Sequence, residues 1–323
     1  MRSVFSIAAI TFVACTSVSP AGASEAYPTK PVRVIVPWPP GGSNDISGRI
    51  IAQKLSEALG RQFIIDNRAG ASGVVGTEIL AKTPPDGYTI MVQSATHLAN
   101  AHLYKNLSYD VLKDFVGIGP ICAQVGMLVV HPSMPVKAVR DLIGLAKAKP
   151  GEVIYGSSGS ASFVHLSMAL LMSMTDIKMI HVPYKGGAPV NTAIAAGEVQ
   201  AMIAVSGSVL PLVTAGRVRA IAVTSERRMQ VFPDVPTIAE SGVPGYEFTA
   251  WIAVLAPAGV PKPIVNKLNA EIQKIQRMPD VAQKLKDQTL DPVIMAPEQF
   301  AQRLKSDYTK YEKVIKLSGA ELD

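Results

Sequence analysis

Three short segments of this 323-residue chain combine glycine with serine, threonine or asparagine in a pattern suited to binding an anion. They read PPGGSND at residues 39–45, SATH at residues 94–97 and GSSGSAS at residues 156–162. Small residues let a ligand approach the backbone, and hydroxyl and amide groups add hydrogen-bond donors. Each segment follows a strand-like run and precedes a helix, so the first free N–H groups of that helix would face the ligand. The pattern predicts carboxylate binding by backbone amides, although helix capping explains any single segment equally well.

Other chemistry has less support in the sequence. Phosphate is less favoured because the chain lacks a Gly-x-x-x-x-Gly-Lys-Ser/Thr loop and the three segments contain no arginine. A serine hydrolase is the minor alternative, because GSSG at residues 156–159 misses the Gly-x-Ser-x-Gly spacing by one residue and its serines have no identifiable base. Neither a metal site nor a cofactor is expected, because the histidines are scattered and form no His-Glu-x-x-His motif; they are His97, His102, His131, His165 and His181.

The start of the chain resembles a secretory signal peptide. Arg2 precedes an apolar stretch at residues 4–14 and a tract of small residues at 17–24, and the apolar stretch is shorter than the roughly 20 residues that span a bilayer. We expect a signal peptide at residues 1–23, cleaved after Ala23, with Ala26 as the second choice and lipidation at Cys15 as the rival. Cleavage would leave Cys122 alone, and its apolar surroundings predict a buried hydrophobic residue.

The composition describes a globular protein with about two domains. Hydrophobic residues make up 48% and charged residues 17%, which is too apolar for a disordered chain. The net charge is +6, but the basic residues are spread along the chain and aromatic residues are only 6%. A nucleic-acid partner is therefore not expected. Beyond the signal peptide, proline, glycine or charge interrupts every apolar run, so no further membrane segment is predicted.

Strand-like and helix-like patterns alternate along the rest of the sequence. This alternation is typical of an α/β protein with mostly parallel sheets and crossover helices. Residues 115–130 contain two strand-like pieces. The other predicted strands are residues 32–36, 63–65, 88–93, 153–156, 179–183, 201–205, 218–224 and 248–255. The predicted helices are residues 46–59, 74–81, 136–149 and 162–174, one starting at Pro189, and residues 263–275 and 297–317.

Five motifs, in this order, resemble the extracytoplasmic solute receptors of tripartite tricarboxylate transporters, the Bug family. They are PWPPGGSND at residues 37–45, NRAGASG at 67–73, PPDGYT at 84–89, HVPYKG at 181–186 and LAPAGVP at 255–261. The resemblance runs from Tyr27 to the end of the chain. It implies a two-lobed periplasmic binding protein of the flytrap, type II-like class, with crossing hinge strands near residues 121–124 and 250–254. Lobe 1 would comprise residues 27–124 plus 252–323, and lobe 2 residues 125–251.

The resemblance also implies which residues bind the ligand. One carboxylate end would lie at the first two turns, partly through ordered water, with an aromatic residue over the ligand; these residues are Trp38, Pro40, Gly41, Gly42, Asn44, Asp45, Ser94, Ala95, Thr96 and His97. The serine-rich turn would reach the ligand from the other lobe through Ser157, Ser158, Gly159, Ser160 and Ser162, with Ser206 completing the set. Asp45 could instead favour the positive end of its helix, and His165 could cap, fill the core or touch ligand.

One departure from the family pattern bears on the ligand. Many relatives have an acidic residue in the strand at 201–205, where this chain has Ala204. Without a partner for an ammonium group, we expect a simple or aromatic carboxylate in preference to an amino acid. The expected partners are that small acid and membrane transporter subunits, and we expect a periplasmic monomer. A ligand sensor for a signalling partner is the alternative function.

Overall fold

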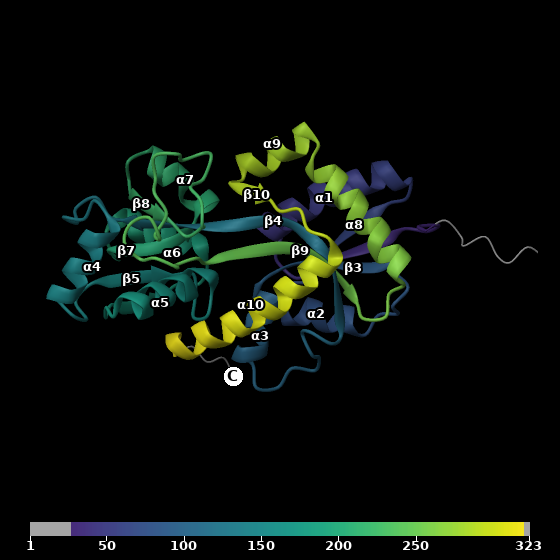
Figure 1. The fold of residues 1–323 in the computed structure, drawn as a ribbon, viewed down its shortest axis with the longest axis horizontal. Coiled ribbons are helices and arrows are strands. Elements are labelled where there is room, and N and C mark those ends of the chain that lie inside the picture. The colour runs from purple at the N-terminus through teal and green to yellow at the C-terminus, as the bar shows by residue number, and fades with distance from the viewer. Residues whose placement is uncertain (1–26, 320–323) are drawn as a thin grey trace, which may run out of the picture.

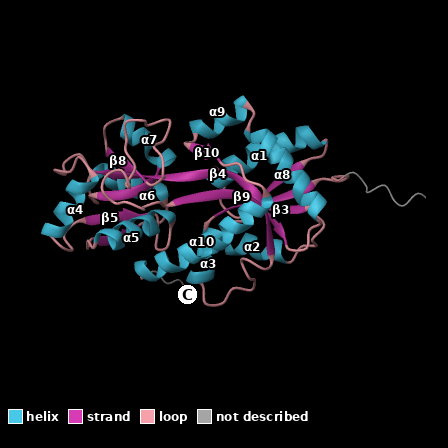
Figure 2. Cartoon of the chain, in the orientation of Figure 1, coloured by secondary structure: helices cyan, strands magenta, loops and turns pink. Residues whose placement is uncertain are grey.

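The computed structural model describes residues 27–319, which form two lobes joined by long strands (Figure 1). The predicted signal peptide at 1–23, its cleavage after Ala23 and the lipidation alternative at Cys15 lie outside the described residues. Strands and helices alternate along the chain, and a continuous sheet runs the length of the molecule with helices on both faces (Figure 2). The predicted two-lobed α/β class is therefore confirmed.

The first lobe starts with three parallel strands and their crossover helices. The first strand is a run of β-branched residues, and the helix after it ends where Gly60 takes a left-handed conformation with φ 66°. The second and third strands pair in parallel with the first on either side. The elements are β1 (Val32–Val36), α1 (Ser43–Leu59), β2 (Phe63–Asn67), the 3₁₀ turn η1 (Ala71–Gly73), α2 (Val74–Ala81), β3 (Thr89–Ser94) and α3 (Thr96–Leu103).

Two long strands, β4 (Phe115–Val130) and β9 (Thr249–Pro257), connect the lobes. They pair antiparallel with each other, and β4 exchanges β9 for new partners between Val125 and Gly126. The interpretation of residues 115–130 as two strand-like pieces was wrong, because β4 is one strand of 16 residues. Register shifts on either side of Pro120 absorb this residue, which has no N–H to donate. The lobe boundaries given above stay a prediction.

The second lobe repeats the alternation of strands and helices. Here β5 pairs in parallel with β6 and β7, while β7 and β8 pair antiparallel with β4. The sheet is thus parallel towards its two ends and antiparallel around β4 and β9, which refines the expected mostly parallel arrangement. The elements are α4 (Val139–Ala148), β5 (Ile154–Ser157), α5 (Phe163–Thr175), β6 (Ile180–Pro183), α6 (Gly187–Ala196), β7 (Ala201–Val205), α7 (Ser206–Thr214) and β8 (Arg219–Val223).

After β9 the chain returns to the first lobe and then crosses beneath both. It forms α8 (Lys262–Gln276), α9 (Pro279–Asp287), β10 (Leu290–Pro292) and α10 (Pro297–Ser318). Helix α10 packs against α3 of the first lobe and α5 of the second, and it lies across both lobes in Figure 1. The sequence patterns predicted α8 and α10 but gave no range for α3, α7, α9 and β10, which are short.

Beneath α10 the apolar core is continuous between the lobes. One buried cluster includes Leu98 of α3, Leu128 of β4, Leu171 of α5 and Val314 of α10. The opposite face of each lobe has a separate cluster, under α1 and α8 in the first lobe and under α6 and α7 in the second. The two lobes are therefore joined along one face by packing and by two strands.

A pair of glycine substitutions tests how tightly α10 packs on β4. A Cβ atom on Gly117 would lie 2.5 Å from Cδ1 of Phe300, whereas one on Gly144 of α4 would meet nothing within 4 Å. We expect Gly117→Ala to lower the free energy of unfolding by about 1–3 kcal/mol. Gly144→Ala should raise it by about 0.5–1 kcal/mol, because alanine favours helix interiors. Urea unfolding followed by circular dichroism measures both, and shifts of the same sign would contradict this packing.

Candidate functional site

A cleft of about 580 Å³ lies between the lobes and takes its wall from both. On the first lobe the wall follows the carboxyl ends of β1 and β3, and on the second lobe those of β5, β6 and β7. Ligands of open α/β sheets bind at these strand ends, where each chain segment turns into its next helix. The cleft is therefore the candidate binding site.

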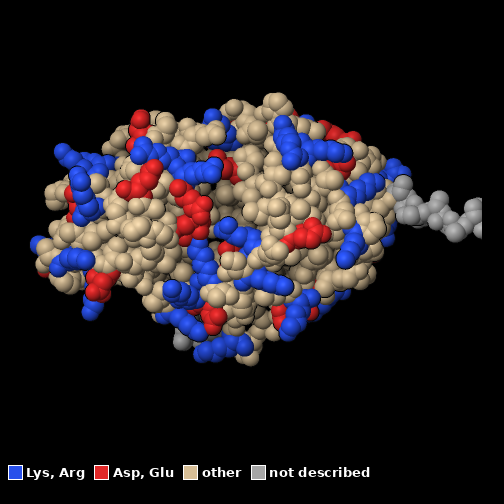
Figure 3. Space-filling view, viewed as in Figure 1, with Lys and Arg blue, Asp and Glu red and all other residues tan. Residues whose placement is uncertain are grey.

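Five helices begin at this cleft. Residues at or next to the starts of α1, α3, α5, α6 and α7 line it, including Ser43, Thr96, Phe163, Gly187 and Ser208. The first N–H groups of each helix have no partner within the helix, and its amino end has a partial positive charge. Within the described part of the chain, no lysine, arginine, aspartate or glutamate belongs to the wall, although such residues are scattered over the surface in Figure 3. The partial positive charge along the wall therefore comes from the helix N-termini and not from charged side chains.

The structure brings ten of the sixteen predicted residues together on the cleft wall. The wall residues are Trp38, Pro40, Gly42, Asn44, Ser94, Thr96, Ser158, Gly159, Ser160 and Ser162. The other six, Gly41, Asp45, Ala95, His97, Ser157 and Ser206, are not part of the wall. Of these, all but Gly41 are buried, so they would act on a ligand through the wall residues.

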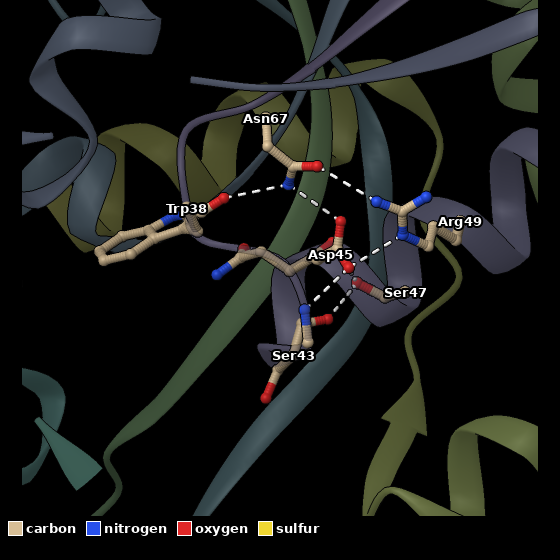
Figure 4. A network of polar contacts seen from close by, with 8 residues as sticks. Trp38, Ser43, Asp45, Ser47, Arg49 and Asn67 are labelled. Atoms are coloured by element: carbon tan, nitrogen blue, oxygen red, sulfur yellow. Dashed lines mark hydrogen bonds and ion pairs between the residues drawn. The ribbon is translucent and has the colours of Figure 1, made fainter. Parts of the chain in front are cut away.

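Asp45 is the centre of a polar network that fixes the first turn (Figure 4). Its carboxylate accepts hydrogen bonds from the Gly41 N–H at 2.9 Å, from Arg49 Nε at 2.9 Å and from Asn67 Nδ2 at 2.9 Å. Asn67 Nδ2 also donates to the carbonyl oxygen of Trp38 at 3.0 Å. Burial alone would raise the pKa of Asp45, but these hydrogen bonds and the Arg49 charge outweigh it and lower that pKa. The ionised side chain therefore holds residues 38–45 in place.

His97, Ala95 and Ser206 have structural surroundings. His97 Nε2 lies 2.9 Å from the Val111 carbonyl, and the ring stacks on Tyr109. Burial lowers the pKa of His97 to about 4, against the opposing effect of the Val111 carbonyl. Ala95 is fully buried at the start of α3. The Ser206 hydroxyl lies 2.9 Å from the Thr289 hydroxyl and so ties the start of α7 to the segment before β10.

The serine-rich turn rests on two histidines. Ser157 Oγ lies 2.6 Å from His181 Nε2, and the Ala161 N–H donates to His165 Nδ1 at 3.0 Å. The two imidazole rings are parallel, with centroids 4.0 Å apart. The statement that these serines have no identifiable base was wrong, because the fold brings His181 from the next strand. Yet Ser157 is fully buried, so this pair supports the turn and does not present a nucleophile.

Acid should lower the stability of the folded protein by protonating the two histidines behind the serine-rich turn. Burial lowers the pKa of His165 to about 4, with a smaller contribution from the His181 charge, and burial also lowers the pKa of His181. Since the folded protein binds these protons more weakly, stability falls as the pH drops from about 6.5 towards 4. We expect His165→Asn, which keeps an acceptor near Ala161, to reduce the slope of melting temperature against pH. Met168→Ala in the same helix removes no titratable group and should keep the wild-type slope; equal slopes in all three proteins would contradict this.

Sequence reasoning missed several parts of the wall. The start of α6 contributes Gly186, Gly187 and Asn191, and α7 contributes Ser208. The glycine pair followed by Pro189 was a usable signal for a helix start at the cleft. Gln124 of β4 was not predicted either, because nothing local marks a residue of a buried strand as part of a site.

Residues 27–319 contain neither a cluster of metal-ligand side chains nor a helix suited to crossing a bilayer. Among residues 27–319, no three histidine, cysteine, aspartate or glutamate side chains lie close enough to hold a metal ion. Cys122 is a free, buried thiol whose pKa is raised by burial, as its apolar surroundings predicted. None of the helices in this range has the length and apolar character needed to cross a bilayer.

Comparison with known proteins agrees with this geometry. The model of the tripartite tricarboxylate transporter family receptor matches residues 48–320. The chain belongs to this receptor family. The receptor is 33% identical over 313 residues to BugT of Bordetella pertussis, covering 96% of each chain. The family resemblance inferred from the five motifs is therefore confirmed.

Two solved structures of relatives contain bound acids. An R. palustris protein with adipate has 38% identity and a TM-score of 0.81, with 92% of this receptor and 100% of that chain covered. MatC from Rhodopseudomonas palustris with bound malate has 29% identity and a TM-score of 0.76, covering 90% and 100%. The receptor also has the fold of the periplasmic binding protein BugD, with 29% identity and a TM-score of 0.76, covering 91% of this receptor and 99% of that chain. Its family consists of substrate-binding receptors, not enzymes.

Proposed function

We propose that this protein captures a small dicarboxylate in the cleft between its lobes and delivers it to a tripartite tricarboxylate-type membrane transporter. The observation that carries the proposal is the meeting of five helix N-termini, from both lobes, at a cleft wall without charged side chains. A hydrogen bond to a charged group contributes about 1.5–3 kcal/mol. Four or five such bonds supply the roughly 8 kcal/mol of micromolar binding without any lysine or arginine.

Each end of the ligand has its own set of donors in this proposal. Gly42, Asn44, Ser94 and Thr96 of the first lobe hold one carboxylate, with Asp45 positioning the turn. Ser158, Ser160 and Ser162 of the second lobe hold the other end, together with Gly187 at the start of α6. The adipate and malate seen in relatives are acids of this kind.

The second lobe also supports a ligand without an amino group. Ala204 is buried in β7, and its neighbours Met202 and Val205 contribute apolar surface to the cleft wall. Since an ammonium group would meet no carboxylate on this wall, we propose a simple or aromatic carboxylate in preference to an amino acid.

Transport requires that the ligand favour a closed arrangement of the lobes. A ligand that bridges both lobes binds the closed state more tightly and so shifts the equilibrium towards it. We propose that the closed, loaded form is what the transporter recognises, that the protein acts in the periplasm, and that it does so as a monomer.

Calorimetry with a matched set of ligands tests the proposal. We expect adipate to bind with micromolar or tighter affinity. Its neutral diamide, which has the same length, should not bind, because the helix N-termini select for negative charge. Glutamate should bind at least about 10-fold more weakly than glutarate, since its ammonium group must be desolvated without a partner. Native mass spectrometry of protein purified without refolding adds an independent search for a co-purified acid. A folded protein that binds no member of a broad dicarboxylate panel would overturn the proposal.

A further inference from the structure

The side chain of Trp38 lies on the cleft wall with its one polar atom directed away to a neighbour. Its indole Nε1 donates a hydrogen bond to Oε1 of Gln93 at 2.6 Å. Tryptophan has no other hydrogen-bonding atom in its side chain. Trp38 therefore presents only hydrocarbon to the cleft.

Gln93 is held in the orientation that makes this contact. Its Oε1 also accepts a hydrogen bond from the Ser94 N–H at 2.8 Å, and its side chain is fully buried. The amide nitrogen has no hydrogen-bond partner and is packed so closely that a Cβ atom on Gly73 would lie 2.6 Å from it. A buried N–H without a partner is unfavourable. A hydrocarbon side chain of similar size would avoid that cost, so the function of this glutamine lies in its oxygen atom.

Apolar residues continue the hydrocarbon surface across the cleft. Phe163 and Val164 of α5 and Met202 of β7 line it from the second lobe. The helix N-termini and serine hydroxyls supply donors to the carboxylates at the ends of a ligand. Gln124 of β4, one of the two strands that connect the lobes, is a further polar residue of the wall.

We infer that Gln93 is a positioning residue for ligand selection: by occupying Trp38 Nε1, it makes the cleft favour dicarboxylates with an unsubstituted hydrocarbon spine over hydroxylated acids of equal length. The inference rests on the proposed dicarboxylate function. A ligand hydroxyl against Trp38 loses its hydrogen bonds to water and finds no donor or acceptor there. An added hydroxyl in an apolar pocket is disfavoured by about 10- to 100-fold.

The first test uses the wild-type protein with adipate and 3-hydroxyadipate, whose hydroxyl lies on the inner part of the spine, in calorimetry. We expect adipate to bind at least about 10-fold more tightly. Equal affinities, or tighter binding of the hydroxy acid, would overturn this inference and leave the proposed function standing. Binding of neither acid would refute the dicarboxylate function and this inference with it.

The second test assigns the preference to Gln93. In Gln93→Met the indole N–H loses the buried acceptor that directs it away from the cleft. The ring can then turn its N–H towards a ligand hydroxyl, so we expect the affinity ratio to fall below about 3-fold. Gln93→Glu keeps an oxygen acceptor at this place and should preserve the ratio even if both affinities change. In protein labelled with fluorotryptophan, the Trp38 ¹⁹F resonance, assigned with Trp38→Phe, should shift in Gln93→Met and stay near its wild-type position in Gln93→Glu.

Gln124→Met separates this mechanism from direct recognition by the hinge strand. If Gln124 recognised the ligand hydroxyl, this variant would change the affinity ratio while Gln93→Met would not, which would overturn the role of Gln93. If the Gln93 variants fail to fold, the inference is tested instead by the ratio of the affinities for adipate and the hydroxy acid, measured in the wild-type protein and in Trp38→Phe. Phenylalanine keeps the wall apolar and should preserve the preference for adipate, and a lost preference would contradict the inference.

Discussion

Gly42→Asp is expected to abolish ligand binding without harming the fold. Gly42 is the N-cap of α1, with φ −82° and ψ 167°, and no side chain caps this helix. Because this conformation suits any residue and a Cβ atom would meet only the Pro39 carbonyl, at 3.8 Å, aspartate fits there. Aspartate is a good N-cap, so the free energy of unfolding should stay unchanged or rise by a few tenths of a kcal/mol. Its carboxylate would occupy the N–H groups that the ligand needs.

The loss of affinity should be large. Two like charges 4 Å apart repel by about 4 kcal/mol at the effective dielectric of a protein surface, so we expect at least about a 100-fold weaker affinity for adipate. Gly42→Asn is the matched control, because asparagine caps the helix equally well but has no charge. It should lose much less affinity than the aspartate variant. Calorimetry and thermal melting measure the two effects, and equal affinities in both variants would show that no carboxylate binds at this helix end.

Asp45→Ala is expected to cause the second large effect, a loss of stability. The substitution removes the acceptor of the Gly41 N–H and of Arg49 Nε, and it takes one of the two acceptors from Asn67 Nδ2. Hydrogen bonds to a charged group contribute about 1.5–3 kcal/mol each, so the free energy of unfolding should fall by at least about 2 kcal/mol. The affinity for adipate should also fall, because residues 38–45 lose the side chain that orders them.

Arg49→Ala provides the comparison for Asp45→Ala. The Arg49 side chain is 53% exposed, so its ion pair with Asp45 contributes less than about 1 kcal/mol.

The pH dependence of the free energy of unfolding is a further check. Since the pKa of Asp45 is lowered in the folded state, its contribution is present above about pH 4 and lost as the pH falls through the folded-state value. Urea unfolding between pH 8 and pH 3 should show this loss of stability in the wild-type protein. If Arg49→Ala lowered the free energy of unfolding at neutral pH more than Asp45→Ala does, Asp45 would not be the centre of the network.

The contact between His165 and the serine-rich turn and the contact between Gln93 and Trp38 have the same structural role. In each case a wall segment of the cleft is oriented by a buried side chain that does not reach the cleft itself, His165 behind the serine-rich turn and Gln93 behind Trp38. We expect variation of such supporting residues to alter selectivity or acid sensitivity while the backbone that lines the cleft stays the same.

Local patterns in the sequence were sufficient for most of the elements and for three of the cleft turns. Strand β1 and the end of α1 at Gly60 follow from β-branched residues, helical spacing and a left-handed glycine, all of which act between close neighbours in the chain. The small residues at 156–162 likewise identified a turn that lines the cleft. Short elements such as α7, with Pro211 inside it, have too few residues for their periodicity to be recognised.

The sequence by itself thus determined the order of most strands and helices, the small-residue turns that line the cleft, and the receptor family. Only the tertiary structure decided which residues meet. His181 reaches Ser157 across 24 residues, Gln93 reaches Trp38 across 55, and Thr289 reaches Ser206 across 83. These contacts depend on the register of paired strands and on the crossing of β4 and β9 between the lobes. Such pairings arise from burial summed over the whole sheet, and no local stretch of sequence encodes that sum.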